Sequence, residues 1–159
     1  AATSPTSGVP SQSDIGLPVK QGGEQIGFTY KTDFTGGVDA ALISISSGVD
    51  SQQKDFIGNS ISGFGTATNG LKVYKVGAIT GLTYGTITDV NIYFTDISGN
   101  QVRGFEITGD NGKFGESGDS GAAIVSVDSP HRIIGIISSG LHTSSSNLPE
   151  DIKSKMGLV

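Results

Sequence analysis

The sequence predicts an all-β domain that ends in one short helix, and three observations lead to that fold class. Glycine occupies 25 of the 159 positions and charged residues make up only 16%, a composition typical of β-rich proteins with many tight turns. Short apolar runs rich in Ile, Val, Thr, Tyr and Phe recur from Ile26 onward. Glycine-bearing turns separate these runs, so we expect neighbouring strands to pair.

Most of the expected strands are four to eight residues long, and Asn100 is expected at the tip of a hairpin. At the end of the chain, Pro149 suits the first turn of a helix and Gly157 ends it. The acidic residues Glu150 and Asp151 follow Pro149 directly, where they favour the positive end of the helix dipole. The strands that we expect are Ile26–Tyr30, Ala40–Ile45, Leu71–Val76, Gly85–Ile97, Val102–Thr108, Ala122–Val127 and Ile133–Ile137.

Composition also excludes several classes of function. The net charge is −5 and the ten Lys and Arg residues are scattered, so nucleic acid is not expected as a partner. The absence of cysteine excludes disulfides, thiolate metal sites and a cysteine nucleophile. No apolar stretch is long enough to span a bilayer, and the two histidines and fifteen carboxylates show no close ligand spacing. We therefore expect no membrane partner, no metal and no cofactor.

The segment Phe114-Gly-Glu-Ser-Gly-Asp-Ser-Gly-Ala-Ala-Ile-Val125 carries the chemistry that can be predicted from sequence. A serine hydroxyl needs a base to remove its proton and donors already aimed at the developing oxyanion. Glycine on both sides of Asp119-Ser120 allows a tight turn that points the amides of Gly118 and Ser120 into one cavity. The alternative is a hydrophilic turn before a buried strand.

Two further segments make this motif more specific. Gly-Asp-Ser-Gly followed by an apolar strand and then by Gly135-Ile-Ile-Ser-Ser-Gly140 resembles the trypsin and chymotrypsin clan of serine peptidases. Upstream, Val73-Tyr-Lys-Val-Gly-Ala-Ile-Thr-Gly-Leu-Thr-Tyr-Gly-Thr-Ile87 is similar to an element of bacterial and plant trypsin-like peptidases, with Ala78 and Ile79 replacing two usual residues. The resemblance covers roughly residues 36 to 159.

The resemblance implies a chymotrypsin-like antiparallel β-barrel fold, with a complete second barrel and part of the first. Residues 1–13 would then form a flexible arm, residues 14–70 a remnant of the first barrel, and residues 71–159 the second barrel and the helix. It also implies a serine endopeptidase that acts on polypeptides.

Residue by residue, the resemblance makes Ser120 the nucleophile and Asp39, in Gly37-Val-Asp-Ala-Ala-Leu-Ile43, the orienting acid. The amides of Gly118 and Ser120 would form the oxyanion hole. Asp119 would shape this loop without taking part in proton transfer. The resemblance also implies two substrate-binding parts. One is the pocket wall from Phe114 to Ser117, and the other is the strand edge Ser138, Ser139 and Gly140, which would pair with a substrate backbone.

The pattern departs from the clan at the general base. The clan places its histidine before the aspartate, and no histidine precedes Asp39 here. His131 is expected to be a solvated turn residue, and His142 would lie near the substrate pocket. We expect the chain to be the C-terminal part of a longer peptidase whose histidine lies on a missing or separately cleaved N-terminal fragment. The alternatives are a catalytically inactive pseudo-peptidase that binds proteins, and a jelly-roll binding module in which the motif is accidental.

Overall fold

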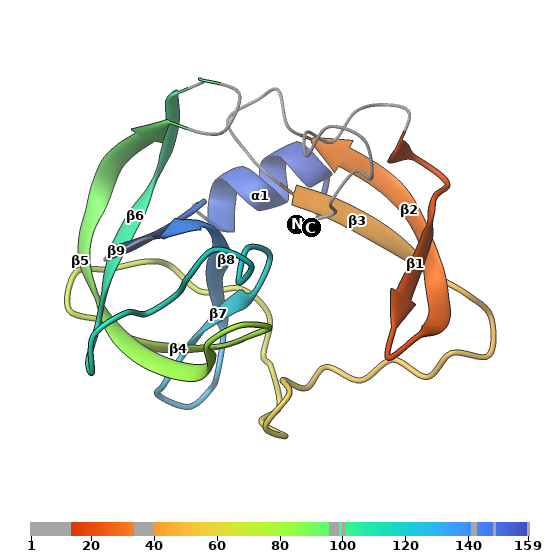
Figure 1. Cartoon of the computed structure of the whole chain (residues 1–159), viewed down its shortest axis with the longest axis horizontal. Helices are drawn as coiled ribbons and strands as arrows, with labels where there is room; N and C mark the ends of the chain where they lie inside the picture. The colour runs from red at the N-terminus through yellow and green to blue at the C-terminus, as the bar shows by residue number, and fades with distance from the viewer. Residues whose placement is uncertain are drawn as a thin grey trace.

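The computed structural model describes residues 14–33, 40–95, 99, 101–140, 143–147 and 149–158. These residues contain nine strands and one helix (Figure 1). Three strands form one sheet, the other six form a closed barrel, and a segment without a named strand or helix connects the two. The strands are β1 (Pro18–Gln21), β2 (Glu24–Asp33), β3 (Ala40–Ile45), β4 (Lys72–Gly77), β5 (Gly81–Thr95), β6 (Gln101–Gly109), β7 (Ala123–Ser126), β8 (Ile133–Gly140) and β9 (Thr143–Asn147), and the helix is α1 (Pro149–Met156).

Six strands close into an antiparallel barrel in the order β4-β5-β6-β9-β8-β7, and β7 pairs back onto β4. The alternation of apolar and polar residues along the strands explains which side chains enter the barrel. On β6, for example, Phe105 and Ile107 are fully buried, while Glu106 between them is half-buried and Thr108 is exposed. The inward side chains form one core cluster, made of Ala67, Val73, Ile87, Phe105, Ile107, Phe114, Ile124, Ile134 and Ile137.

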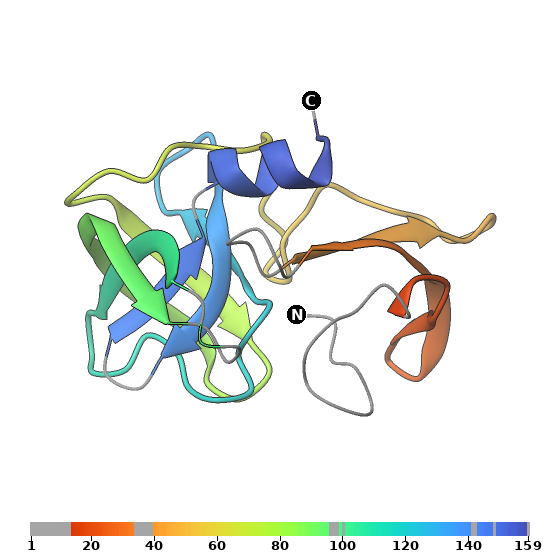
Figure 2. The ribbon, with the colours of Figure 1, turned by 90° about the horizontal axis from the view of Figure 1, so that it is seen from above.

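The strands β1, β2 and β3 form a separate three-stranded antiparallel sheet. In Figure 2 this sheet stands beside the barrel, and the helix α1 lies across the space between them. Neither core cluster among the described residues includes a residue of β1 or β2. Large apolar side chains on this sheet are exposed instead, with Tyr30 at 66% and Ile45 at 49%. The barrel therefore has its own core, whereas in the described part of the chain the sheet contributes core residues only from β3, through Ala40 and Leu42.

The helix α1 connects the two sheets through its apolar side. Ile152 and Met156, one turn apart, are buried and pack in a second cluster with Ala40 of β3, against Ile136 of β8. Lys31 Nζ of β2 also donates a hydrogen bond of 2.6 Å to the carbonyl of Lys155. At eight residues α1 is too short to cross a bilayer, and the described residues contain no other helix.

The prediction of an all-β fold with an antiparallel barrel and a C-terminal helix is confirmed. Each of the seven expected strands overlaps an observed strand, and the ends differ by a few residues. Two strands, β1 and β9, were not expected. Residues 1–13 and Asn100 lie outside the described residues, so the predicted arm and hairpin tip stay predictions. The division of the chain at residue 70 also stays a prediction.

Candidate active site

The loop that carries Ser120 is held at both ends by backbone hydrogen bonds. Asp119 N donates to the carbonyl of Glu116 at 2.9 Å, and Ala122 N donates to the carbonyl of Asp119 at 3.0 Å. Gly121 N then donates to the carbonyl of Ile137 on β8 at 2.8 Å. These bonds place Ser120 inside a tight turn that is fixed to the barrel. Gly118 and Gly121 have φ values of 100° and 90°, which only glycine adopts without strain, so the sequence around Ser120 determines this turn.

Ser120 and Asp119 point to opposite sides of the loop. The side chain of Ser120 is exposed, whereas Asp119 is only 1% exposed. The Asp119 carboxylate accepts hydrogen bonds from Ile79 N at 2.8 Å, Thr80 N at 3.2 Å and Thr80 Oγ1 at 2.6 Å. It also accepts one from Glu116 N at 3.1 Å. The loop thus turns its carboxylate inward and its hydroxyl outward.

The environment of Asp119 keeps this carboxyl ionised. Burial alone would raise the pKa of Asp119. The hydrogen bonds from Thr80, Ile79 and Glu116 outweigh that effect and hold its pKa well below the usual range. Lys75 Nζ lies 3.4 Å from the carboxylate, and both side chains are fully buried. The negative charge at the base of the loop is therefore matched by a lysine inside the barrel.

The backbone amides of Gly118 and Ser120 are available to a ligand. Among the described residues, neither amide donates a hydrogen bond to another group of the chain. Backbone donors without an internal acceptor at an exposed turn can bind an anion or a developing oxyanion. The oxyanion hole at Gly118 and Ser120 stays a prediction.

The second predicted element, Ser138–Gly140, lies directly beside the serine loop. Ile137 donates to the carbonyl of Ala122 at 3.0 Å and accepts from the amide of Gly121, so Ser138 follows a residue that is bonded to the two residues after Ser120. On one edge, the backbone of Ser139 and Gly140 pairs with β9. On the other edge of β8, β7 pairs only as far as Ile136, and no strand in the described part of the chain pairs with Ser138, Ser139 or Gly140 there. This free strand edge can accept an extended peptide by β-strand addition.

The side chains predicted to line the substrate pocket in front of the serine differ in exposure. Ser117 is exposed in the serine loop. Phe114 is fully buried in the barrel core, and a Cβ added at Gly85 would lie only 2.9 Å from its ring. Because the ring has no exposed surface, it cannot touch a substrate in this structure. Phe114 would support a pocket only from behind, and its predicted contact with substrate has no support here.

Of the remaining predicted site residue and the two histidines, His131 alone is among the described residues. Asp39 and His142 lie outside the described residues. His131 is half-buried beyond the far end of β7, where Nδ1 lies 2.9 Å from the carbonyl of Ser126. Its ring also packs edge-on against Tyr74, with the ring centroids 6.0 Å apart. His131 is therefore a half-buried structural residue rather than the solvated turn residue that was expected.

Lys75 and Thr80 are the site residues that sequence reasoning missed. Both contact Asp119, and both belong to the β4–β5 hairpin, 39 or more positions before it. The signal that could have found them is a lysine between the apolar residues Tyr74 and Val76 of the strand, since a buried lysine requires an anionic partner.

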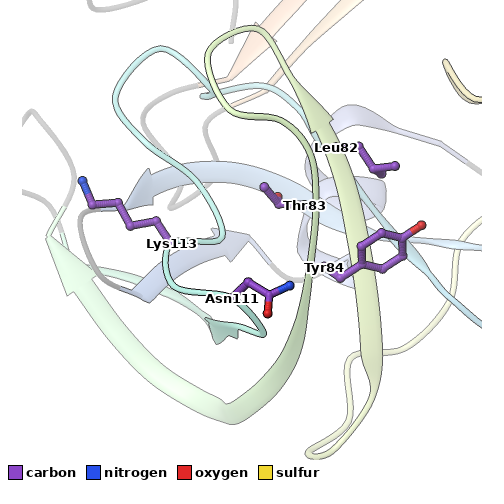
Figure 3. Close-up of a pocket in the computed structure, with 5 residues that line it drawn as sticks. All are labelled: Leu82, Thr83, Tyr84, Asn111 and Lys113. Carbon is purple, nitrogen blue, oxygen red and sulfur yellow. The ribbon is translucent and has the colours of Figure 1, made fainter.

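A small cavity of about 140 Å³ lies between β5 and the loop that follows β6 (Figure 3). It is lined by Leu82, Thr83, Tyr84, Asn111 and Lys113. None of these residues belongs to the serine loop, so the cavity is separate from the candidate site. Among the described residues, no group of three His, Cys, Asp or Glu could hold a metal ion.

No family model and no curated protein matches the sequence, but solved structures match its fold. Nocardiopsis protease (NAPase) superposes with a TM-score of 0.71 at 23% identity, over 90% of this chain and 77% of that one. Thermobifida fusca protease A superposes with a TM-score of 0.69 at 21% identity, over 91% and 77%. Cellulomonas bogoriensis chymotrypsin has a TM-score of 0.68 at 24% identity, over 82% and 73%. The chain therefore has the chymotrypsin-like fold, as the resemblance implied.

Proposed function

We propose that this chain is part of a serine endopeptidase that hydrolyses peptide bonds through an acyl-enzyme on Ser120. The observation that carries the proposal is the arrangement of the serine loop. Ser120 is exposed on a turn fixed at both ends, with two free amides beside it and the adjacent carboxylate locked inside the barrel. The proteases that share the fold support a polypeptide as the substrate.

The reaction proceeds in two acyl transfers. Ser120 Oγ attacks the carbonyl carbon of the scissile bond while an imidazole accepts the hydroxyl proton, and the amides of Gly118 and Ser120 bind the oxyanion. The tetrahedral intermediate collapses, the C–N bond breaks, and the imidazolium gives its proton to the leaving amine. Water, deprotonated by the same imidazole, then hydrolyses the ester and regenerates Ser120. Asp39 orients the imidazole and stabilises its charged form.

The imidazole comes from an N-terminal segment of the precursor that is not present in these 159 residues, either missing or separately cleaved. The chain has two histidines, and His131 is held by Ser126 away from the serine loop. The protease neighbours are matched over 73% to 77% of their chains, which leaves about a quarter of each unmatched. The exposed apolar side chains of β2 and β3 provide a surface against which additional strands of a first barrel could pack.

Substrate binding is assigned to the free edge of Ser138, Ser139 and Gly140 and to Ser117 across from it. An extended peptide added to this edge would have its backbone held in register and its scissile carbonyl brought to Ser120. The side chains of Ser117 and Ser138 would flank the substrate, and Phe114 would support this region from the core.

Labelling with a fluorophosphonate tests the proposal. The protein is prepared as this chain and as the product of the longer gene that contains the histidine segment, and each is reacted and mapped by mass spectrometry. We expect a single adduct on Ser120 when the histidine segment is present, and no adduct in Ser120→Ala. The matched control, Ser117→Ala, changes another exposed serine of the same loop and should still label.

The absence of any adduct on Ser120 in both preparations would instead support the pseudo-peptidase. That candidate has one observation in its favour, since Ser120 contacts no imidazole among the described residues.

A further inference from the structure

Two segments of the barrel flank the serine loop from opposite sides. Strand β7 begins shortly after the loop, and it runs antiparallel to β8 on one edge and to β4 on the other. The C-terminal ends of β4 and β8 therefore lie at the same end of the barrel as Ser120. The edge Ser138–Gly140 forms the end of β8, and the turn of residues 78–80 follows the end of β4.

The contacts of the loop agree with this placement. On the β8 side, Gly121 and Ala122 form backbone hydrogen bonds with Ile137. On the other side, a Cβ added at Gly118 would lie 2.7 Å from Cγ1 and 3.2 Å from Cδ1 of Ile79. The side chain of Ile79 therefore packs directly against Gly118, whose amide is one of the two proposed to bind the oxyanion.

Ile79 is held firmly at its backbone, although most of its side chain is exposed. Its amide donates to Asp119 Oδ1 at 2.8 Å, and Thr80 donates to the same carboxylate. The side chain of Ile79 is nevertheless 60% exposed. It also replaces a usual residue in the trypsin-like pattern of Val73–Ile87. Because the turn is already ordered, a second apolar group can pack against this isoleucine at little entropic cost.

The path of a substrate over the loop follows from these positions. The residues before the scissile bond pair with the Ser138–Gly140 edge, and the carbonyl oxygen lies at the amides of Gly118 and Ser120. The part of the substrate that leaves as an amine then extends away from β8 and toward residues 78–80. Its first residue passes Gly118 and lies beside Ile79.

We propose that Ile79 is a specificity-determining residue that binds an apolar side chain on the residue after the scissile bond. The inference rests on the proposed function for the reaction that uses this site. Small uncharged residues adjoin it in sequence, since Ala78 and Ser117, next to Gly118, are both exposed. A leucine side chain can cover the exposed part of Ile79, whereas a charged side chain would lose solvation there without gaining a partner.

Partition of an acyl-enzyme between water and an added amine tests the inference, because the amine must bind where the leaving group was. The protein with its histidine segment is acetylated on Ser120 by p-nitrophenyl acetate, which releases p-nitrophenol. An amino acid amide then attacks the acetyl carbon, the C–Oγ bond breaks, and the imidazole passes the amine proton to Ser120. The ratio of N-acetyl amide to acetate is measured for leucinamide and for glycinamide, and Ser120→Ala gives the uncatalysed background.

We expect leucinamide to give a ratio roughly fivefold higher than glycinamide at equal concentration, because one face of its side chain leaves water against Ile79. Ile79→Thr keeps the β-branched shape but removes apolar surface, so this preference should disappear. The matched control is Leu82→Thr, since Leu82 is 43% exposed on the same hairpin but lines the separate cavity. It should keep the preference. Each ratio compares two reactions of one acetyl-enzyme, so a general loss of reactivity cancels.

A second measurement does not depend on catalysis. The δ1 methyl signal of Ile79, assigned by its loss in Ile79→Thr, is followed by NMR while leucinamide or glycinamide is added to the same preparation. Leucinamide should shift this signal along a saturating curve, because its side chain contacts the methyl group. Glycinamide has no side chain and should leave the signal in place.

Three results of the partition experiment would overturn the inference: equal ratios for the two amides in wild type, a preference that survives Ile79→Thr, or a preference lost equally in Leu82→Thr. If wild type forms no acetyl-enzyme, the proposed function fails. The methyl titration then still decides whether Ile79 binds an apolar group, since a signal that leucinamide does not shift would overturn the inference as well.

Discussion

Two consecutive residues, Asp119 and Ser120, divide the structural and chemical tasks of the loop. Asp119 is buried and accepts four hydrogen bonds, whereas Ser120 is exposed and has no partner among the described residues. Adjacent side chains in a tight turn can face opposite ways when the flanking residues are glycines with positive φ, as Gly118 and Gly121 are. The carboxylate that fixes the loop is therefore distinct from the hydroxyl proposed to react.

The lowered pKa of Asp119 predicts how stability depends on pH. The folded pKa lies below the unfolded value of about 4, so the ionised carboxylate stabilises the fold above that pH and loses this effect as pH falls toward the folded pKa. We expect Asp119→Asn to lower the free energy of unfolding at neutral pH by about 3–5 kcal/mol, because the buried Lys75 loses its counterion.

Urea unfolding of both proteins from neutral pH down to the acid range measures this dependence. The gap between wild type and Asp119→Asn should narrow as the pH falls below about 4. Asp110→Asn, which removes the exposed partner of Lys72, should cost under about 1 kcal/mol at any pH. A gap between wild type and Asp119→Asn that stays constant across this range would contradict the assigned ionisation.

The segment that connects the three-stranded sheet to the barrel is fastened to β4 by a cluster of polar side chains. Tyr74 points out of the barrel and donates its hydroxyl proton to Asp55 Oδ2, while Asn59 Nδ2 donates to the Tyr74 hydroxyl at 2.9 Å. Asp55 Oδ1 in turn accepts from the amides of Ile57 and Asn59 at 3.0 and 2.7 Å. These polar contacts, rather than a separate apolar core, hold residues 55–59 of the connection against β4.

The contacts in this cluster predict that Tyr74 ionises at a higher pH than a tyrosine in the unfolded chain. Burial raises the pKa of Tyr74, and the hydrogen bond to Asp55 raises it further, to about 12. Since the unfolded value is about 10, the folded protein keeps this proton in a window where the unfolded chain has lost it, and stability must fall as pH rises through that window.

Ultraviolet absorbance of tyrosinate measures the titration directly. One of the four tyrosines should ionise near pH 12, and Tyr74→Phe should remove that step. Tyr93→Phe, which changes a tyrosine that is 69% exposed, should leave the step in place. A titration curve without a step near pH 12 that Tyr74→Phe removes would show that Tyr74 is not bonded as described.

Some elements could be predicted from sequence because their signal is local. The serine loop has glycines at the positions that need positive φ, and β7 and β8 are short apolar runs between turns. By contrast, β9 has the sequence Thr-Ser-Ser-Ser-Asn, which has no apolar alternation and so could not be predicted as a strand. Its strand conformation comes from pairing with β6 and β8 when the barrel closes. The pairing of Lys75 with Asp119 is equally non-local, so only the complete barrel reveals it.

At the scale of the whole molecule, the barrel and the sheet differ in how well they bury apolar surface. On one face of the sheet, Ile43 lies opposite Thr29, and Ile45 lies opposite Gly27, beside Val19. Ile43 and Ile45 are 43% and 49% exposed. A sheet face with exposed isoleucines tends to bind another apolar surface, in agreement with the proposal that strands of the histidine segment pack there.

The exposed isoleucines Ile43 and Ile45 lead us to predict that the isolated chain associates with itself. We expect the chain alone to sediment partly as oligomers, and the double change Ile43→Thr/Ile45→Thr to reduce that fraction severalfold, since threonine keeps the β-branched shape but removes apolar surface. The control is Ile57→Thr, which changes an isoleucine of similar exposure on the connecting segment and should have no effect. Equal association of all three proteins in sedimentation velocity would show that this face binds nothing.

The central claim is that Ser120 forms an acyl-enzyme, and mass spectrometry after reaction with an activated peptide ester tests it most directly. The protein is produced with its histidine segment and quenched in acid within the first turnover. The proposed function predicts one added acyl group per chain, on the peptide that contains Ser120, and its loss on return to neutral pH. An acyl group on another residue, or none while Ser120 remains accessible in the folded protein, would contradict it.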